Sequence, residues 1–211
     1  MAGGRLFVIA APSGAGKTSL VKALLACEPN LRVCVSHTTR PRRPNEVDGR
    51  DYHFVAVEQF KKMIAAGGFL EYASVFDHFY GTSRQALAEA FGRGHDVILE
   101  IDWQGAAQVR ERTRSTAGGA AGCVTVFVLP PSRAELERRL RSRGTDSEAV
   151  IARRLRDAVA DMTHYGEFDF VIVNDEFERA LTDLQRLYAG ESTGLRSDRT
   201  ALQPLLAELL G

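Results

Sequence analysis

Short apolar segments alternate with longer amphipathic segments along most of this chain of 211 residues. The apolar segments are largely continuous, which is typical of parallel strands that are buried on both faces. The expected strands are Arg5–Ala10, Asp96–Asp102, Val124–Leu129 and Asp169–Val173. The segments between them repeat apolar residues every three to four positions, which predicts helices. The expected helices are Thr18–Cys27, Ser147–His164, Phe177–Ala189 and one that opens with a capping box of Ser132 and Glu135 and runs to about Arg143. This alternation predicts an α/β fold with a doubly wound parallel sheet and right-handed crossovers.

One long segment does not follow this alternation. Residues 36–83 are rich in Thr, Arg, Pro, Tyr, Phe and Gly, and they suggest short strands and turns with one helix near Glu58–Ala66. We therefore expect an inserted subdomain within a main domain that covers residues 1–189. Residues 190–211 should form a polar linker followed by a short Leu-rich amphipathic helix. The pattern leaves open whether this helix docks on its own domain or on a second subunit, so a homo-oligomer stays open.

Composition and charge exclude several classes of protein. The chain is 45% hydrophobic and 26% charged, as in an ordinary water-soluble globular protein. It carries 27 basic and 27 acidic residues, and this balance argues against general nucleic-acid binding. No apolar run is long enough to span a bilayer, and the first ten residues have no cleavage-like signal, so we expect a cytoplasmic protein. Cys27, Cys34 and Cys123 lack metal-ligand spacing and are expected to be buried free thiols.

The first predicted strand leads directly into a glycine-rich phosphate-binding loop. Small residues at this place let several backbone N–H groups point at one anion, at the start of a helix. The expected ATP-binding residues of the loop are Ala11, Pro12, Ser13, Gly14, Ala15, Gly16, Lys17 and Thr18. Lys17 would reach the β- and γ-phosphates, and the Thr18 hydroxyl would bind Mg²⁺ directly. The usual motif begins with Gly, so Ala11 fits only with a negative φ. A simple strand-to-helix turn remains the alternative.

A second group of polar residues lies in the irregular segment. Arg40 and Arg43 are three residues apart, among prolines and hydroxyl side chains, which favours a rigid anion clamp. Tyrosine hydroxyls farther along, at Tyr52 and Tyr80, could donate to a phosphate without adding charge. A carboxylate such as Glu71 can accept two hydrogen bonds from one planar edge. Guanine offers such an edge at N1–H and the 2-amino group, and adenine does not.

With these motifs in this order, nearly the whole chain resembles the guanylate kinase family of bacterial nucleoside-monophosphate kinases. The resemblance is carried by APSGAGKT, SHTTRPRRPNEVDG-DY, FLEYASVF, YGTS, ILEIDWQGAAQVR, LPPS, RLRSRGTDSE, HYGEFDF and IVND. It implies a P-loop NTPase-type core with an inserted GMP-binding subdomain over about residues 36–83. The GMP-binding residues that it implies are Ser36, Arg40, Arg43, Glu46, Tyr52, Glu71, Tyr80, Thr82 and Asp102. Of these, the Arg and Tyr residues and Ser36 would hold or line the phosphate, whereas Glu71, Thr82 and Asp102, with Ser36, would read guanine.

The resemblance also implies an arginine-rich lid over about residues 133–154. Arg139 and Arg143 lie one helical turn apart, on the same face of the predicted helix. Together with Arg154 and Lys17, they would surround the transferring phosphoryl group as the catalytic residues. Asn174 matches the contact to the ATP base. Asp102 follows a buried strand, as does the acid that positions Mg²⁺ in phosphate-loop enzymes, so it is a second metal candidate through water.

Several residues keep a second interpretation or depart from the family pattern. Tyr52 and Tyr80 could be packing aromatics, Ser36 a strand-end cap and Asn174 an ordinary turn residue. Glu100 stands where the family usually has Asp, which leaves its role open. Asn45 replaces a usual Gly, and Asn also tolerates left-handed backbone. Asp77-His78 stands where Gly-Asn is common.

The implied reaction is in-line phosphoryl transfer, ATP + GMP ⇌ ADP + GDP, with Mg²⁺ as cofactor. GMP, and with it dGMP, is the expected acceptor. No general base is needed, because the acceptor phosphate is already largely ionised near neutral pH, and the five histidines are expected to be structural. Closure of the lid and the subdomain should exclude water. A kinase of another small phosphate should lack the Ser36–Tyr52 and Glu71–Thr82 set. A non-catalytic scaffold domain typically has a degraded phosphate loop, and a GTP-hydrolysing switch would carry an Asn-Lys-x-Asp tract.

Overall fold

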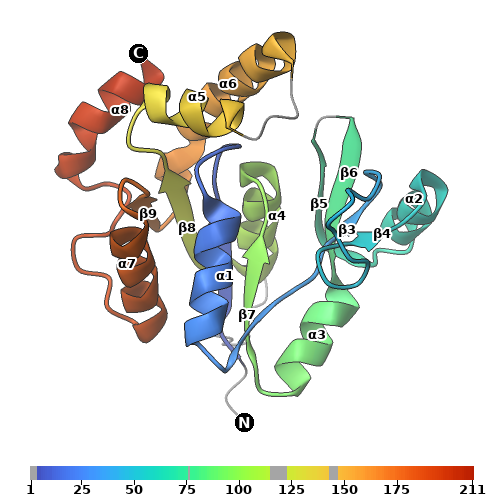
Figure 1. Cartoon of the computed structure of the whole chain (residues 1–211). Coiled ribbons are helices and arrows are strands. Elements are labelled where there is room, and N and C mark those ends of the chain that lie inside the picture. The colour runs from blue at the N-terminus through green and yellow to red at the C-terminus, as the bar shows by residue number, and fades with distance from the viewer. Residues whose placement is uncertain (1–3, 76, 115–122, 143–146) are drawn as a thin grey trace. The chain divides into compact units, whose positions relative to one another are not determined.

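The computed structural model describes residues 4–75, 77–114, 123–142 and 147–211 (Figure 1). The chain divides into two compact units. Unit 1 comprises residues 1–8 and 30–124, and unit 2 comprises residues 9–29 and 125–211. The division therefore passes through the first strand.

A five-stranded sheet has the order β2-β7-β1-β8-β9. Its strands are β1 (Leu6–Ala10), β2 (Leu31–Val33), β7 (Asp96–Glu100), β8 (Val124–Leu129) and β9 (Phe170–Val173). All five residues of β1 are buried, and so are most residues of β7 and β8, as expected for strands covered on both faces. β2 pairs in parallel with β7, and β8 pairs in parallel with β9. The predicted α/β fold with a parallel sheet is thus confirmed. β2 was not predicted, because three residues are too few to establish a period.

Unit 1 also contains a second sheet, of four strands in the order β4-β3-β6-β5. The strands are β3 (His37–Thr38), β4 (His53–Phe54), β5 (Phe69–Val75) and β6 (His78–Ser83), and α2 (Val57–Ala65) lies between β4 and β5 in the chain. β3 pairs in parallel with β4, whereas β6 is antiparallel to both β3 and β5. Two further helices of this unit, α3 (Arg84–Gly92) and α4 (Trp103–Arg114), were not singled out by the sequence pattern.

The β5–β6 hairpin has two irregular points. The register shifts between Phe69 and Glu71, and Phe69, Leu70 and Glu71 are all buried, so the usual alternation of faces is interrupted by a β-bulge. At the other end, Val75 pairs with His78, and Asp77 in the turn between them has a φ of 67°. A two-residue hairpin turn requires such a left-handed residue, which explains why Gly or Asn would suit this position.

Unit 2 contains most of the remaining helices. They are α1 (Lys17–Cys27), α5 (Arg133–Arg141), α6 (Glu148–Met162), the 3₁₀ helix η1 (Thr163–Glu167), α7 (Phe177–Ala189), the 3₁₀ helix η2 (Thr200–Leu202) and α8 (Gln203–Leu210). Within this unit, α1 packs against α7, and α6 packs against both α5 and α8. The C-terminal helix therefore docks on its own chain. The residues before it are not a free linker, because Val171 N–H donates to Leu195 O and Ser197 N–H donates to Asp169 O along β9.

Two local expectations need correction. Ser132 caps α5, since its hydroxyl accepts from the Glu135 N–H at 3.0 Å. The second half of the expected capping box is missing among the described contacts, because the Glu135 carboxylate accepts from Arg138 and Arg139. The three cysteines are free, as expected, but the expected burial is wrong for Cys27, which is exposed at the end of α1, and Cys123 is only half-buried. Across the described residues, no helix is both long enough and apolar enough to cross a membrane.

Candidate active site

The phosphate-binding loop joins β1 to α1 in unit 2. Gly14 and Gly16 have φ values of 96° and 92°, in the left-handed region that favours glycine. Ala11 is not in this region, since Asp77 is the one non-glycine residue with positive φ in the described chain. The methyl group of Ala11 is therefore tolerated, as predicted.

Both loop glycines are also required by close packing. A Cβ atom on Gly14 would lie 2.9 Å from Leu136 Cδ1 and 3.1 Å from Leu140 Cδ2, both on α5. A Cβ atom on Gly16 would collide with the side-chain nitrogen of Asn174. The loop is thus held between α5 and the residue that follows β9.

Asn174 and Arg139 fasten the loop through one carbonyl oxygen. The buried Asn174 donates from Nδ2 to Ala15 O at 2.7 Å. Arg139 donates to Asn174 O at 3.0 Å and to Ala15 O at 3.4 Å, while its Nε is paired with Glu135 at 2.7 Å. The structure therefore brings Arg139 and Asn174 to the loop, although the sequence predicted them from different parts of the chain. A hydrogen bond from Asn174 to the loop was not expected.

Of the other residues predicted for this region, those that the structure describes lie on α1 and α6. Lys17 begins α1, and Thr18 is exposed in its first turn. Arg154 is half-buried on α6. Arg143 lies outside the described residues. A single hydroxyl ligand such as Thr18 suits Mg²⁺, which usually takes one or two protein ligands and completes its shell with water and phosphate oxygens.

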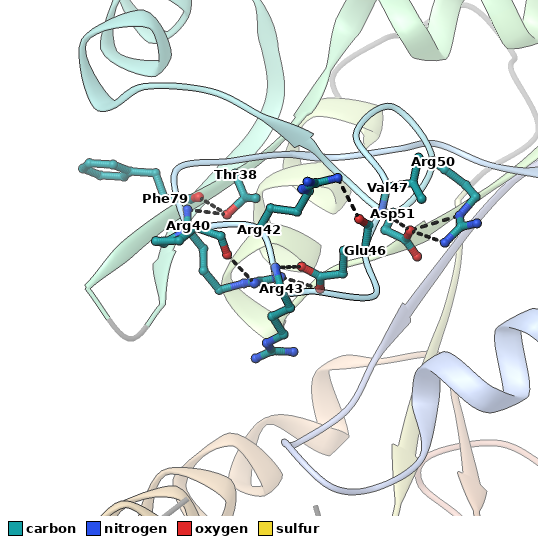
Figure 2. Close-up of polar contacts among 10 residues, drawn as sticks. Thr38, Arg40, Arg42, Arg43, Glu46, Val47, Arg50, Asp51 and Phe79 are labelled. Carbon is teal, nitrogen blue, oxygen red and sulfur yellow. Dashed lines mark hydrogen bonds and ion pairs between the residues drawn. The ribbon is translucent and has the colours of Figure 1, made fainter. Parts of the chain in front are cut away.

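In unit 1, the predicted anion clamp is held in place by Glu46 (Figure 2). Arg40 Nη2 donates to Glu46 Oε1 at 2.7 Å, and the Arg43 N–H donates to Glu46 Oε2 at 2.8 Å. Arg40 Nη1 also donates to Pro41 O at 2.7 Å. Partial burial would raise the pKa of Glu46, but the hydrogen bonds from Arg40 and Arg43 outweigh it and lower that pKa. Glu46 is therefore ionised at neutral pH and positions the clamp.

Two tyrosines lie beside the Arg40 guanidinium. Its Cζ is 5.6 Å from the ring centroid of Tyr52, a cation–π distance, and the rings of Tyr52 and Tyr80 meet edge-on at 5.8 Å. Burial raises the pKa of Tyr52 to about 12, and the nearby Tyr80 and Glu100 add to the rise. The Tyr52 hydroxyl therefore keeps its proton and remains a donor.

The predicted base-reading residues cluster on β5 and β6, with Ser36 just before β3. Ser36 Oγ and Thr82 Oγ1 are 3.3 Å apart, and both side chains are buried. Glu71 lies opposite Thr82 across the strand pair and is 2% exposed. Its Oε1 is buried without a hydrogen-bond partner. Burial raises the pKa of Glu71 to about 7; the Asp102 carboxylate adds to the rise, whereas Thr82 and Arg112 oppose it. A buried acceptor without a partner is costly, so it points to a donor that a ligand would supply.

Asp102 connects β7 to this group through a helix N-terminus. Its Oδ1 accepts from the Gly105 N–H at 2.8 Å, which caps α4. A Cβ atom on Gly105 would lie 2.5 Å from Glu71 Oε2. Glu71 and Asp102 thus both lie against Gly105. The sequence pattern gives Gly105 no role, because only the fold reveals a contact between positions 34 residues apart.

The chain is similar to known proteins over nearly its whole length. Residues 3–191 match the family model described as guanylate kinase. Guanylate kinase of Methylococcus capsulatus is 53% identical over 211 residues, covering 100% of both chains. Guanylate kinase of Escherichia coli K12 is 48% identical over 212 residues, covering 100% of this chain and 99% of the other. The crystal structure of guanylate kinase from Anaplasma phagocytophilum matches with a TM-score of 0.71 at 30% identity, covering 98% of this chain and 95% of that one. On this evidence, the chain belongs to the guanylate kinase family.

Proposed function

We propose that this chain transfers the γ-phosphoryl group of ATP to GMP, giving ADP and GDP. Besides membership of the family, the proposal rests on one observation. The Glu71 carboxylate of unit 1 is buried, and one of its oxygens has no hydrogen-bond partner among the described residues. A carboxylate in that state can accept from guanine N1–H and the 2-amino group, and an adenine base would present no matching pair of donors.

We assign ATP to the loop in unit 2. The backbone N–H groups between Ala11 and Thr18, together with the Lys17 ammonium group, would hold the donor phosphates. Thr18 would be a ligand of Mg²⁺, which, when bound, would neutralise charge on the donor phosphates. Asn174 would meet the adenine base near the loop that it already contacts. Arg139, Arg143 and Arg154 would stabilise the charge of the transferring group.

We assign GMP to the second sheet and the end of β7 in unit 1. Arg40 and Arg43, aligned by Glu46, would bind the GMP phosphate with the hydroxyls of Tyr52 and Tyr80. Ser36, Thr82 and Asp102 would complete the reading of guanine around Glu71. These contacts address the base and the phosphate, so we expect dGMP to be accepted as well.

The chemistry then depends on placement of the two nucleotides. One oxygen of the GMP phosphate attacks the γ-phosphorus as the bond to the ADP oxygen breaks, and no protein group removes a proton, because the second phosphate pKa is about 6. The two nucleotides must meet where water is excluded, or ATP would be hydrolysed. We therefore expect a large closing movement when both bind. Equal scattering dimensions with and without both nucleotides would contradict it.

The direct experiment is a coupled assay of ADP formation with ATP and either GMP, AMP, CMP or UMP, run on the unaltered chain and on Glu71→Gln. We expect a strong preference for GMP in the unaltered chain. In the variant, an amide that presents N–H toward the base should lose most of that preference with little change in the KM for ATP. Turnover of AMP as fast as GMP by the unaltered chain would refute the proposal.

A further inference from the structure

The outer edge of β5 is covered by side chains of α4. β5 is the last strand of its sheet, so one row of its backbone groups faces away from β6. The Gln108 amide covers this row at Tyr72: its Nε2 donates to Tyr72 O at 2.7 Å, and its Oε1 accepts from the Tyr72 N–H at 3.2 Å. One side chain thereby supplies the two hydrogen bonds that a neighbouring strand would have made.

Arg112, one helical turn farther along α4, covers the β-bulge. Its Nη1 donates to Leu70 O and, at 3.4 Å, to Phe69 O. Two successive carbonyls can face the same side because the bulge interrupts the alternation of the strand. Arg112 therefore fixes the irregular backbone just before Glu71, and Gln108 fixes the residue just after it.

Gly105 completes this stripe of α4. Positions 105, 108 and 112 recur at helical spacing and so lie on one face of α4. The missing side chain of Gly105 leaves the space that Glu71 Oε2 occupies, and the Gly105 N–H is held by Asp102. The carboxylate of Glu71 thus lies against Gly105, and the backbone before and after Glu71 is hydrogen-bonded to side chains of the same helix.

We propose that Gly105, Gln108 and Arg112 are positioning residues that fix the Glu71 carboxylate beside Asp102 and thereby set selectivity for guanine. This inference rests on the proposed role of Glu71 in binding GMP. Two hydrogen bonds from one planar edge require both carboxylate oxygens to lie in the plane of the base, so a small rotation or shift loses one of them. A bulged edge strand alone would not hold that orientation. The hydrogen bonds and the packing contact from α4 hold the β5 backbone and the carboxylate in place.

The test uses Gly105→Ala and Gln108→Leu in the full chain. Leu removes both hydrogen bonds of Gln108 at similar size, and Ala adds one methyl group against Glu71 Oε2. Gln104→Leu is the matched control, since Gln104 is exposed on the same helix. The measurements are GMP and ATP binding by calorimetry, the kcat/KM ratio for GMP over AMP, and the melting temperature.

For Gly105→Ala we expect GMP binding to weaken roughly tenfold to a hundredfold, the loss typical of a misaligned hydrogen bond to a charged group. ATP binding should stay unchanged. The melting temperature should change little, because the higher helix propensity of Ala offsets the displacement of Glu71. Gln108→Leu should weaken GMP binding about tenfold, and Gln104→Leu should weaken neither nucleotide. If Gly105→Ala and Gln108→Leu both lower the melting temperature but leave GMP affinity unchanged, the stripe only protects a sheet edge.

Combination with Glu71→Gln separates the positioning role of α4 from the proposed role of Glu71 in binding GMP. If α4 acts through the carboxylate, Gln108→Leu should have little further effect on GMP binding once Glu71 is Gln. If Glu71→Gln itself leaves GMP binding unchanged, the proposed role of Glu71 fails. If Glu71→Gln weakens binding but Gly105→Ala and Gln108→Leu do not, only the positioning role fails.

Discussion

The two regions to which we assign ATP and GMP satisfy their polar groups in opposite ways. In the phosphate-loop region of unit 2, the polar side chains behind the loop are used within the protein: Ala15 O accepts from both Asn174 and Arg139. In unit 1, the second sheet contains both of the buried side-chain atoms that lack a partner in the described residues, His37 Nδ1 and Glu71 Oε1.

This difference follows from what each region would recognise. A phosphate can be bound by backbone N–H groups, which can stay in contact with water until the anion arrives, and the described residues of the loop contain no buried side-chain N or O atom without a partner. A base edge is recognised by side chains in a site that excludes water, so their acceptor atoms have no donors until the base binds. The acceptor region is therefore expected to lose stability for the sake of selectivity, whereas the donor region need not.

The largest expected effect tests the donor side. Lys17→Ala removes the one side-chain charge that the loop directs at the donor phosphates, so kcat should fall by roughly 10³-fold, as when a main electrostatic contact to the transition state is removed. The fold should persist, because Lys17 opens α1 without being buried. Lys22→Ala, at an exposed site on the same helix, is the control, and both are measured by ADP formation with saturating GMP. Near-normal turnover in Lys17→Ala would refute the role assigned to Lys17.

The next effect tests the stability cost on the acceptor side. The pKa of Glu71 is about 7 in the folded chain against an ordinary 4.5, so the folded state holds a proton that the unfolded state releases. The penalty for ionising Glu71 is absent below about pH 4.5 and complete above about pH 7, where it is worth roughly 3 kcal/mol at 1.36 kcal/mol per pKa unit. Without nucleotide, Glu71→Gln should therefore gain stability relative to the unaltered chain as the pH rises from 4 to 8.

Denaturant unfolding at several pH values measures this gain. Exposed Glu111 on α4 gives the control Glu111→Gln, which should show no such pH-dependent difference. A constant difference between Glu71→Gln and the unaltered chain across this range would mean that Glu71 is ionised at no cost, and the contrast between the two regions would fail.

Features set by neighbouring residues were predictable from the sequence, and those set by distant contacts were not. The buried strand β1, the glycine-rich loop that follows it and the Ser132 cap all depend on the residues next to them. The contact of Gly105 with Glu71 depends on how α4 packs on β5, and no local pattern announces it. Likewise, Glu135 has the capping-box spacing from Ser132, but its carboxylate accepts hydrogen bonds from Arg138 and Arg139 instead, about one turn along the helix.

A smaller effect tests the shape of the anion clamp. Arg40→Lys keeps the charge but loses the planar fork that now reaches Glu46 and Pro41 O. We expect GMP binding to weaken about tenfold, the size of one lost charge-assisted hydrogen bond, with ATP binding unchanged in calorimetry. Arg42→Lys is the control, because Arg42 is exposed and makes one longer contact, to Glu46 O at 3.3 Å. Equal effects of the two variants would show that the clamp needs charge alone.

The smallest effect compares two left-handed residues, one in each region. Asp77 has a φ of 67° in the β5–β6 turn, and Gly16 has a φ of 92° in the loop. Gly at position 77 removes the strain of a side chain in this conformation, so Asp77→Gly should stabilise the chain by about 0.5–1 kcal/mol. Ala at position 16 adds that strain and a collision with Asn174, so Gly16→Ala should be destabilising and weaken ATP binding. Melting temperatures and ATP titrations of both variants measure this, and a destabilised Asp77→Gly would mean that the aspartate stabilises its turn by more than its backbone strain costs.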